Sequence, residues 1–407
     1  MSTIQLRNIY KVFGRRSAEA VELLRDGVSR EEAQERTGAV PAVIDISLDI
    51  EPGELFVVMG LSGSGKSTLV RTINRLHEPT AGTIELKGRD ITRLGPAELR
   101  EVRSSSVSMV FQHFALFPHR TVLENAAWGL EVRRRGRSER EERSREALRL
   151  VGLEGWEDSY PDQLSGGMQQ RVGLARALAT DADVLLMDEA FSALDPLIRR
   201  EMQDQLVELQ DTLHKTIVFI THDLNEAMRL GDRIAVLKDG RLVQVGTAED
   251  ILQDPANDYV ASFVQDVDRS RVLTAGSVME KPQAVITTHD GPRAAMRAMR
   301  SLQVSGLLVV DAHRKLRGYV TDDDVATAMR HDAKSLESAI RTDVATISPD
   351  VPLVELFVPA AETPLPLPVE DEHGRLVGVV PRVTLLAALG GQAVDTPDAL
   401  QEEDHRG

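Results

Sequence analysis

Residues Gly60–Thr68 have the composition and spacing of a phosphate-binding loop. The segment reads Gly-Leu-Ser-Gly-Ser-Gly-Lys-Ser-Thr, which fits a glycine, four residues and then Gly-Lys-Ser/Thr. An apolar run, Leu55–Met59, precedes it, and a helix-compatible run, Ser67–Leu76, follows it. The glycines let successive backbone N–H groups point at a phosphate, and the helix N-terminus adds partial positive charge. We therefore expect Lys66 to reach the β- and γ-phosphates of a nucleotide and Ser67 to bind Mg²⁺.

A second candidate anion site follows later in the chain. Leu164–Gln170 reads Leu-Ser-Gly-Gly-Met-Gln-Gln and leads into a helical run, Arg171–Ala179. Ser165 is a good N-cap, and two glycines expose backbone N–H groups at the start of the helix. A monomer needs only one site per triphosphate, so the second site suggests that another copy of the chain uses it.

Polar residues at the ends of apolar runs supply the remaining candidates. The run Val184–Met187 is typical of a buried parallel strand, and ligands gather at the carboxyl ends of such strands. Asp188, directly after it, is a candidate Mg²⁺ ligand, and Glu189 is a candidate acceptor for a proton from the attacking water. His222, after another strand, is a candidate γ-phosphate contact, and Gln112 is a candidate contact to Mg²⁺ or a water.

The elements before the loop predict a second sheet with a helical insertion. Thr3–Leu6 and Val43–Asp49 alternate apolar and polar residues, as half-buried antiparallel strands do. Between them we expect two short helices, one over Ser17–Arg25 and one opened by Ser29 and closed by Gly38. Their mixed charge and lack of a basic face favour a structural insertion over a DNA-binding helix-turn-helix.

The second half of the chain predicts a repeated unit. Thr121–Leu153 has helical periodicity, Val236–Gly246 reads as a hairpin, and a polar linker is expected near 266–271. A pattern of short strand, helix, two strands and helix then runs over Val278–Met329 and again over Ser335–Leu389. A repeat this short indicates two copies of one unit packed on each other.

Composition limits the class of protein. A chain of 407 residues exceeds one ordinary core, and 42% hydrophobic and 28% charged residues are usual for globular domains. No apolar run approaches the ~18–20 residues of a membrane-spanning helix, and the start shows no secretory pattern. The absence of cysteine fits a reducing cytoplasm, and a net charge of −16 argues against a general nucleic-acid binder. We therefore expect any membrane connection to run through partner proteins.

Taken together and in order, these motifs resemble the ATPase subunit of an ABC transporter. The resemblance covers about residues 3–265 and adds the segment Ser192–Asp195 to those above. It implies a head-to-tail dimer in which ATP and Mg²⁺ lie between the loop of one copy and the Leu-Ser-Gly-Gly segment of the other. It implies Glu189 as general base, His222 as positioner of the γ-phosphate and water, and Gln112 as sensor of Mg²⁺ and the membrane subunits. Phe13 is the preferred adenine-stacking residue, with Tyr10 as the alternative.

The resemblance implies a full set of candidate site residues. The catalytic candidates are Glu189, His222, Lys66 and Gln112, and the magnesium candidates are Ser67, Gln112 and Asp188. The nucleotide-binding candidates are Phe13, Gly60, Leu61, Ser62, Gly63, Ser64, Gly65, Lys66, Ser67, Thr68, Ser165, Gly166, Gly167 and Asp195.

The subclass most similar to this chain is the ATPase of glycine betaine/proline importers. The inserted helices at 15–40, the segments at 59–66 and 188–195 and Asn257–Val260 carry this resemblance, which extends over nearly the whole chain. It implies membrane permease subunits, a separate substrate-binding protein and a peripheral position at the cytoplasmic face of the membrane. Choline, carnitine or another small amine is the alternative solute. A non-transport ABC ATPase is a less favoured reading, because such proteins usually carry two ATPase domains in one chain.

The repeated unit resembles a tandem pair of CBS domains, which often bind adenine nucleotides. Gly318–Asp324 fits that family's Gly-x-x-Thr-x-x-Asp, which makes Thr321 and Asp324 the candidate ligand residues. The second copy has Pro381 and Thr384 in those places, so a ligand sensor and a structural dimerisation module both stay open. The expected fold is an α/β nucleotide-binding domain over 1–265, with a RecA-like core, an antiparallel β subdomain and a helical subdomain at about 113–165. An α+β module follows over 272–331 and 335–391, with an acidic, disordered tail over 392–407.

Overall fold

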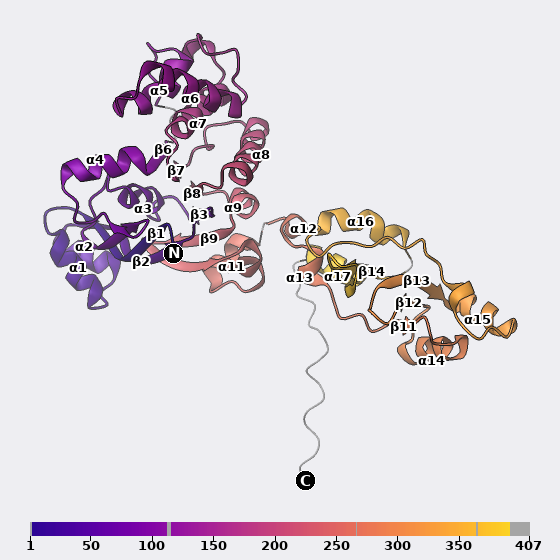
Figure 1. Cartoon of the computed structure of the whole chain (residues 1–407). Coiled ribbons are helices and arrows are strands. Elements are labelled where there is room, and N and C mark those ends of the chain that lie inside the picture. The colour runs from indigo at the N-terminus through magenta and orange to yellow at the C-terminus, as the bar shows by residue number, and fades with distance from the viewer. Residues whose placement is uncertain (1, 112–114, 266, 364, 391–407) are drawn as a thin grey trace. The chain divides into compact units, whose positions relative to one another are not determined.

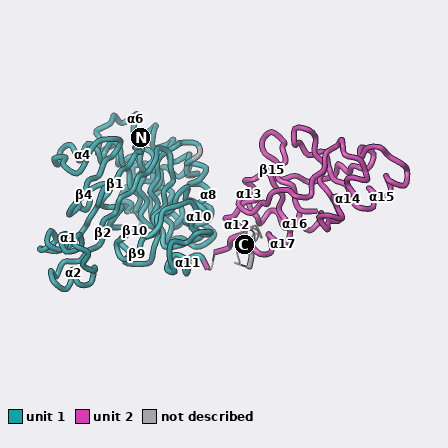
Figure 2. The backbone as a smooth tube through the Cα atoms, turned by 90° about the horizontal axis from the view of Figure 1, so that it is seen from below, with its two compact units in different colours: residues 1–264 teal, residues 265–407 magenta. Residues whose placement is uncertain are grey.

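The computed structural model describes residues 2–111, 115–265, 267–363 and 365–390. The chain divides into two compact units, residues 1–264 and residues 265–407 (Figure 2). Gln112 and the acidic tail at 392–407 lie outside the described residues. Among the residues that are described, no helix combines the length and the apolar character needed to cross a membrane.

The first unit begins with an antiparallel sheet. Its strand order is β2-β1-β4-β5, and Ile4 of β1 pairs with Ile50 of β2. The strands are β1 (Ile4–Phe13), β2 (Val40–Ile50), β4 (Ala81–Leu86) and β5 (Arg89–Asp90). The predicted antiparallel pairing is confirmed, and both β1 and β2 are longer than the alternating runs had indicated. The expected helical insertion forms α1 (Ser17–Arg25) and α2 (Arg30–Thr37), with the Ser29 side chain accepting a hydrogen bond from the Glu32 N–H.

The second sheet of this unit is mainly parallel and buried. Its order is β10-β9-β3-β8-β7-β6, in which only the β9–β10 hairpin is antiparallel. The strands are β3 (Leu55–Met59), β6 (Val107–Val110), β7 (Val184–Asp188), β8 (Thr216–Thr221), β9 (Arg233–Lys238) and β10 (Arg241–Gly246). Every residue of β3, β7 and β8 is buried, as continuous apolar runs predict. Side chains of both sheets share one core, which includes Ile46, Phe56, Leu69 and Val218.

Helices position the loops around these sheets. The helix α3 (Lys66–Ile73) follows β3, and α4 (Pro96–Ser105) precedes β6. A group of three helices, α5 (Val122–Val132), α6 (Arg137–Leu150) and α7 (Gly166–Ala179), packs together and lies away from α1 and α2 (Figure 1). The unit closes with α8 (Pro196–Leu213), α9 (Leu224–Leu230), α10 (Ala248–Gln253) and α11 (Asp258–Val264).

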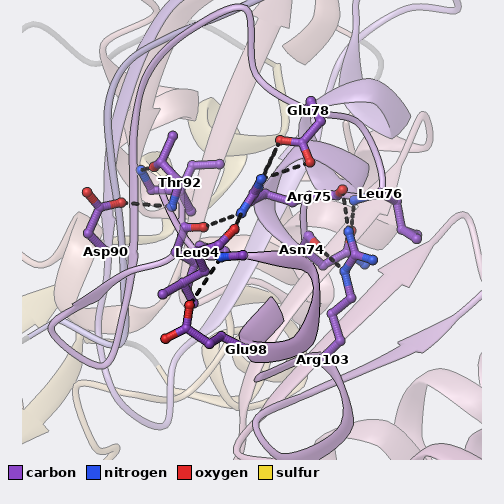
Figure 3. Close-up of polar contacts among 12 residues, drawn as sticks. Asn74, Arg75, Leu76, Glu78, Asp90, Thr92, Leu94, Glu98 and Arg103 are labelled. Atoms are coloured by element: carbon purple, nitrogen blue, oxygen red, sulfur yellow. Dashed lines mark hydrogen bonds and ion pairs between the residues drawn. The ribbon is translucent and has the colours of Figure 1, made fainter. Parts of the chain in front are cut away.

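A polar network fixes the far end of α3 to the neighbouring loop and α4 (Figure 3). The Arg75 guanidinium donates to the carbonyl oxygens of Ile91 and Leu94 at 2.6 and 3.0 Å and also pairs with Glu78. Arg103 of α4 donates to the Asn74 carbonyl at 2.8 Å. The bond from Arg103 satisfies a carbonyl group at the C-terminal end of α3. Together these bonds hold that end of the helix against the loop at 91–94 and α4.

The second unit contains the two repeats. The first has the sheet β11-β12-β13, formed by Val285–Thr287, Gly306–Val310 and Leu316–Thr321, with α14 (Pro292–Leu302) and α15 (Asp322–Arg330). The second has β14 (Leu367–Glu370) and β15 (Leu376–Val380), with α16 (Leu353–Glu362) and α17 (Arg382–Gly390). The remaining elements are the helices α12 (Arg269–Val272) and α13 (Ala275–Val278) and two short 3-10 turns, Pro161–Gln163 in the first unit and Glu337–Ala339 in the second.

Three expectations about elements were wrong in detail. The helical run over Thr121–Leu153 is two helices, because the chain turns at Arg133–Gly136, where Arg134 has a φ of 56°. The expected linker near 266–271 contains the start of α12, whose N-cap is Asp268. In the second repeat, the first strand is reduced to a single bridge between Ile347 and Val369.

Candidate functional site

The carboxyl ends of three adjacent strands bring the main candidate residues to one edge of the parallel sheet. β8 lies between β3 and β7 and is parallel to both. The chain leaves β3 at Gly60, β7 at Glu189 and β8 at His222. The carboxyl edge of a parallel sheet is where such folds bind ligands, because loops and helix N-termini converge there. The structure therefore brings Lys66, Asp188, Glu189 and His222 to one edge of the sheet.

The loop at Gly60–Thr68 has a backbone that only glycine suits at two positions. Gly60 has a φ of 147°, and a Cβ there would lie 2.2 Å from the Leu237 carbonyl oxygen. Gly65 has a φ of 99°, and a Cβ there would lie 2.2 Å from the Ala42 carbonyl oxygen. The loop is thus pressed against β9 and β2, which fixes its curvature. Leu61 and Ser62 are exposed, whereas Ser67 and Thr68 are partly buried in the first turn of α3.

Two side chains of the loop fit the binding of a polyphosphate. The Lys66 ammonium donates to the carbonyl oxygens of Gly60 and Leu61 at 2.8 and 3.0 Å, so it lies across the loop. Burial lowers the pKa of Lys66, and the negative charges of Glu189 and Asp188 act in the opposite direction. The Ser64 hydroxyl is buried and has no hydrogen-bond partner among the described residues. A phosphate would supply both groups with acceptor oxygens.

Asp188 and Ser67 form a donor set that fits magnesium bound with a nucleotide. Both offer oxygen atoms, and α3 packs against β7, the strand that Asp188 ends. No group of three or more His, Cys, Asp or Glu side chains among the described residues could hold a metal alone. Mg²⁺ commonly binds through one or two protein oxygens, substrate phosphates and waters, so this small set is sufficient. In the structure, Arg71 of α3 donates two hydrogen bonds to Asp188 Oδ2.

Glu189 and His222 face each other at the strand ends. His222 Nδ1 lies 3.6 Å from Glu189 Oε2. The Glu189 side chain is 19% exposed and the His222 side chain is 58% exposed. Glu189 has a φ of 47°, and its carbonyl oxygen accepts a hydrogen bond of 2.9 Å from the Ser192 hydroxyl. A non-glycine residue in this region of φ is strained, and such strain often occurs where a side chain must be aimed.

The segment Ser192–Asp195 is a fixed loop that caps α8. The Asp195 carboxylate accepts from the Leu197 and Ile198 N–H groups at 3.2 and 3.1 Å. Arg199, one turn into the helix, donates to the carbonyl oxygens of Phe191 and Leu194. Asp195 is therefore an N-cap, as a carboxylate before Pro196 at a helix start predicts.

The Leu-Ser-Gly-Gly segment lies in the three-helix group. The Ser165 hydroxyl accepts from the Met168 N–H at 3.3 Å, which confirms it as the N-cap of α7. Ser165 and Gly166 are exposed, and Ser165 and Gly167 line a cavity of about 270 Å³ together with Trp156 and Arg171. Among the described residues, no hydrogen bond or ion pair joins this segment to Gly60–Thr68. The two candidate anion sites belong to different groups of elements, the loop between β3 and α3 and the start of α7 in the three-helix group.

The two aromatic candidates have different surroundings. Tyr10 is 4% exposed and belongs to a core cluster with Val21 and Leu24 of the helical insertion. Phe13 is 38% exposed at the end of β1. Its ring meets the His77 ring edge-on at a centroid distance of 5.4 Å, and the Lys11 ammonium lies 4.7 Å from its centroid. Only Phe13 of the two offers ring surface to a ligand.

The candidate CBS residues take part in an internal network. The Thr321 hydroxyl donates to Asp324 Oδ2 at 2.6 Å and caps α15. Arg341 donates to both carboxylate oxygens of Asp324 at 2.8 and 2.9 Å, and with Thr321 it lowers the Asp324 pKa. A cavity of about 230 Å³ lies beside this network, with Gly306 of the first repeat and Leu365 of the second in its wall. Thr384 of the second copy donates instead to Glu280.

Several residues near the site were not singled out from the sequence. Arg71 could have been noticed, because it follows Ser67 by four residues and so shares its helix face. Arg199, Lys11 and His77 gave no comparable signal, because their partners lie in other elements or are backbone carbonyls.

Comparison with known proteins identifies both units. The family model described as "ABC transporter" matches residues 43–192, and the model described as "CBS domain" matches residues 275–331 and 334–391. The solved dimer of the ATP-binding cassette MJ0796 in a post-hydrolysis state with ADP and Pi is 34% identical, with a TM-score of 0.51. That match covers 60% of this chain and 98% of the other.

Three curated relatives align over nearly the whole chain. The glycine betaine/carnitine transport ATP-binding protein GbuA of Listeria monocytogenes is 51% identical over 97% of this chain and 99% of its own length. The glycine betaine transport ATP-binding protein OpuAA of Bacillus subtilis is 50% identical over 95% of this chain and 92% of its own length. The glycine betaine/proline betaine protein ProV of Escherichia coli is 48% identical over 96% and 98%. The α/β fold agrees with these matches, and the chain belongs to the ABC transporter ATP-binding proteins, an ATPase family, in the group that carries tandem CBS domains.

Proposed function

We propose that this chain hydrolyses MgATP to drive uptake of a compatible solute of the glycine betaine class through a membrane permease. The observation that carries the proposal is similarity over nearly the full length to three glycine betaine transport ATP-binding proteins. The site supports it, since a phosphate-binding loop, a buried carboxylate and a carboxylate–histidine pair meet at one sheet edge.

The phosphate-binding loop and α3 hold the triphosphate. Backbone N–H groups of Gly60–Thr68 and the N-terminus of α3 surround the phosphates, and Lys66 turns from the Gly60 and Leu61 carbonyls to the β- and γ-phosphates. Ser67 and Asp188 would hold Mg²⁺, which would supply positive charge next to the phosphate oxygens. Gln112, outside the described residues, is proposed to contact the same ion.

Glu189 and His222 prepare the attacking water. Glu189 accepts the proton of the water, and its strained backbone fixes where its carboxylate lies. His222, 3.6 Å from that carboxylate, orients the water and contacts the γ-phosphate. One water can hydrogen-bond to both groups of a pair at this separation.

A second copy of the chain completes the site. Ser165 and Gly166 are exposed at a helix N-terminus, with the buried Gly167 behind them, and no hydrogen bond among the described residues links this segment to the phosphate-binding loop of the same chain. We propose that this helix N-terminus meets the γ-phosphate held by the partner, and that the Asp195 loop lies at the same interface. Phe13 stacks on adenine, because its ring is exposed whereas Tyr10 is buried in a core cluster.

The remaining assignments concern partners and regulation. The permease receives the closing motion of the dimer, a separate protein delivers the solute, and the chain lies at the cytoplasmic face of the membrane. The tandem CBS domains adjust activity, with the cavity beside Gly306 as the site for an adenine nucleotide. Choline is the second candidate solute, because the choline transport ATP-binding protein OpuBA of Bacillus subtilis is 38% identical over 86% of this chain.

The Glu189→Gln variant tests the catalytic assignment. We expect ATP binding to stay within a factor of about three and turnover to fall by at least ~10²-fold, since a general base contributes about that much. Filter binding of ATP and steady-state phosphate release measure the two quantities. An exposed-carboxylate variant, Glu208→Gln, should keep both. Retained turnover in Glu189→Gln would remove Glu189 as the base.

Reconstitution tests the transport assignment. The chain is combined in vesicles with the permease and binding protein encoded beside it, and ATPase activity is measured with glycine betaine, choline or neither. Stimulation by glycine betaine at lower concentration than by choline is the expected result. Stimulation by choline alone would make choline the solute in place of glycine betaine. A lack of response to any small amine would contradict the transport assignment.

A further inference from the structure

We infer that Arg71 is the counter-ion that holds Asp188 when no magnesium is bound, and that it makes nucleotide binding possible before the metal arrives. The inference rests on the proposed MgATP chemistry and adds a positioning residue to it. Arg71 contacts neither of the groups that react; it acts through Asp188.

The geometry of the pair is specific. Arg71 Nε and Nη2 donate to the same atom, Asp188 Oδ2, at 3.2 and 3.0 Å. The Asp188 side chain is 3% exposed, whereas the Arg71 side chain is 41% exposed. Both donors thus converge on one oxygen of a buried carboxylate, and the other oxygen, Oδ1, faces no donor of this pair. The Arg71 guanidinium is partly exposed to solvent, so it can move away from Asp188 without itself becoming an unpaired charge in the core.

The electrostatic reason is the cost of an isolated buried carboxylate. Asp188 lies next to Glu189, and both negative charges act on Lys66 at the same strand ends. A buried charge without a partner is strongly unfavourable, and two adjacent carboxylates would repel an approaching triphosphate. Arg71 offsets the Asp188 charge from outside the loop. Mg²⁺ offsets the same charge when it is present, so the two cations are alternatives in electrostatic terms.

The position of Arg71 on α3 links this pair to the phosphate-binding loop. It follows Ser67 by four residues and therefore lies on the same face of the helix, one turn further along. The hydrogen bond from Arg71 to Asp188 joins α3 to the end of β7. It therefore joins the helix that carries Ser67 to the strand that carries Asp188. The His77 backbone N–H donates to the Arg71 carbonyl. Burial is the main cause of the lowered pKa of the His77 side chain, and the charges of Lys11 and Arg71 lower it further.

The test compares nucleotide affinity with and without the metal. The full-length chain binds AMP-PNP, which is not hydrolysed, in excess Mg²⁺ or in EDTA, and a fluorescent ATP analogue reports the dissociation constants by competition. In Arg71→Met we expect affinity in EDTA to fall about tenfold and affinity in Mg²⁺ to change less than about threefold, since about 1.4 kcal/mol of lost charge compensation corresponds to a tenfold change. The ratio of the two constants therefore rises. Arg71→Lys, which keeps the charge, should restore most of the wild-type ratio.

A matched control exists on the same strand. Lys87 pairs with Asp183 at 2.7 Å just before β7 begins, at the end opposite Asp188, and both side chains are about half exposed. Lys87→Met should leave the ratio unchanged. Arg71→Gln, which keeps a donor without charge, replaces Arg71→Met should the latter not fold.

The outcomes separate this inference from the proposed function. Equal losses in Mg²⁺ and EDTA would make Arg71 purely structural, and a larger loss in Mg²⁺ would make it an aid to metal binding; either result overturns the inference while leaving the ATPase intact. An unchanged ratio in both neutral variants also overturns it. Failure of the wild-type chain to bind AMP-PNP under any condition would instead contradict the proposed function.

Discussion

At the scale of single residues, the edge of the parallel sheet places ionisable groups in unequal surroundings. Asp188 has an arginine within hydrogen-bonding distance, and Glu189 has a histidine nearby. Glu226, in the first turn of α9, is 7% exposed, and its carboxylate accepts a hydrogen bond of 3.0 Å from the Gln203 side-chain amide. Burial is the main reason that its pKa is raised, although hydrogen bonds from Gln203 and Thr221 act in the opposite direction.

Glu226 should make the folded state less stable at alkaline pH. Its pKa in the folded chain lies above its ordinary value near 4.5, so the folded chain binds the proton more tightly than the unfolded chain. Stability is therefore lost as pH rises from about 4.5 through the folded pKa. Glu226→Gln keeps a partner for Gln203 and removes the charge, so its thermal midpoint at pH 8 should rise by ~2 °C or more. Differential scanning fluorimetry between pH 4.5 and 8 measures the effect.

The control for this variant is an exposed carboxylate. Glu208→Gln on α8 should leave the pH dependence of the midpoint unchanged. If the thermal midpoint of Glu226→Gln at pH 8 is equal to or below that of the wild type, the ionised Glu226 carboxylate is already stabilised inside the folded protein.

At the scale of elements, the network at the end of α3 shows how one arginine side chain fixes a loop by donating hydrogen bonds to the backbone carbonyl groups of that loop. Arg75 has a side chain that is only 10% exposed, and it donates to the Ile91 and Leu94 carbonyls (Figure 3). These bonds hold the chain between β5 and α4. Removing the guanidinium takes a charged donor away from two partly buried carbonyl groups, which costs more than the loss of an exposed bond.

Arg75→Ala should therefore destabilise the first unit by about 1–3 kcal/mol, as expected for two partly buried carbonyl groups that lose a charged donor. Both tryptophans of the chain, Trp128 and Trp156, lie in this unit, so their fluorescence during urea unfolding follows it. Arg89→Ala serves as the matched control, because Arg89 meets Glu98 at 3.5 Å with both side chains about half exposed. That variant should change stability by less than ~1 kcal/mol. Equal effects of the two variants would show that the Arg75 bonds are replaced by water.

The elements also show what can be predicted from sequence. The strand Thr216–Thr221 and the Ser165 cap were predicted correctly, because continuous apolar runs and capping residues act over short distances. The turn at Arg133–Gly136 was missed because charged residues on both sides continue the helical pattern, although Gly136, the N-cap of α6, was a signal in the sequence. The bond between Arg71 and Asp188 joins residues far apart in sequence, so no local pattern could specify it.

Some site assignments depended on tertiary packing in the same way. Tyr10 and Phe13 are equivalent by spacing, yet the helical insertion covers the first and leaves the second exposed. The Thr321 and Asp324 motif was readable, whereas the Arg341 guanidinium on Asp324 comes from the segment that opens the second repeat. Motifs thus identified the chemistry, and the fold determined which groups are accessible.

At the scale of the whole molecule, the two anion sites of one chain imply assembly. Trp156 is 41% exposed and shares a cavity with Ser165 and Gly167. A large exposed aromatic residue beside an exposed helix N-terminus fits a surface that becomes covered when the partner's nucleotide arrives. The Trp128→Phe variant leaves Trp156 as the only tryptophan, since the chain has two.

ATP should therefore change the Trp156 signal and the mass of the protein together. In a Trp128→Phe, Glu189→Gln chain, MgATP should shift Trp156 emission to shorter wavelength, protect it from iodide quenching, and double the mass measured by light scattering. The shift should grow with protein concentration, because dimerisation is a second-order process. Adding Lys66→Ala should abolish both changes, since Lys66 is the proposed contact to the β- and γ-phosphates. A spectral change at monomeric mass would assign Trp156 to a local rearrangement within one chain, and unchanged mass at every concentration would mean that ATP does not bring two copies together.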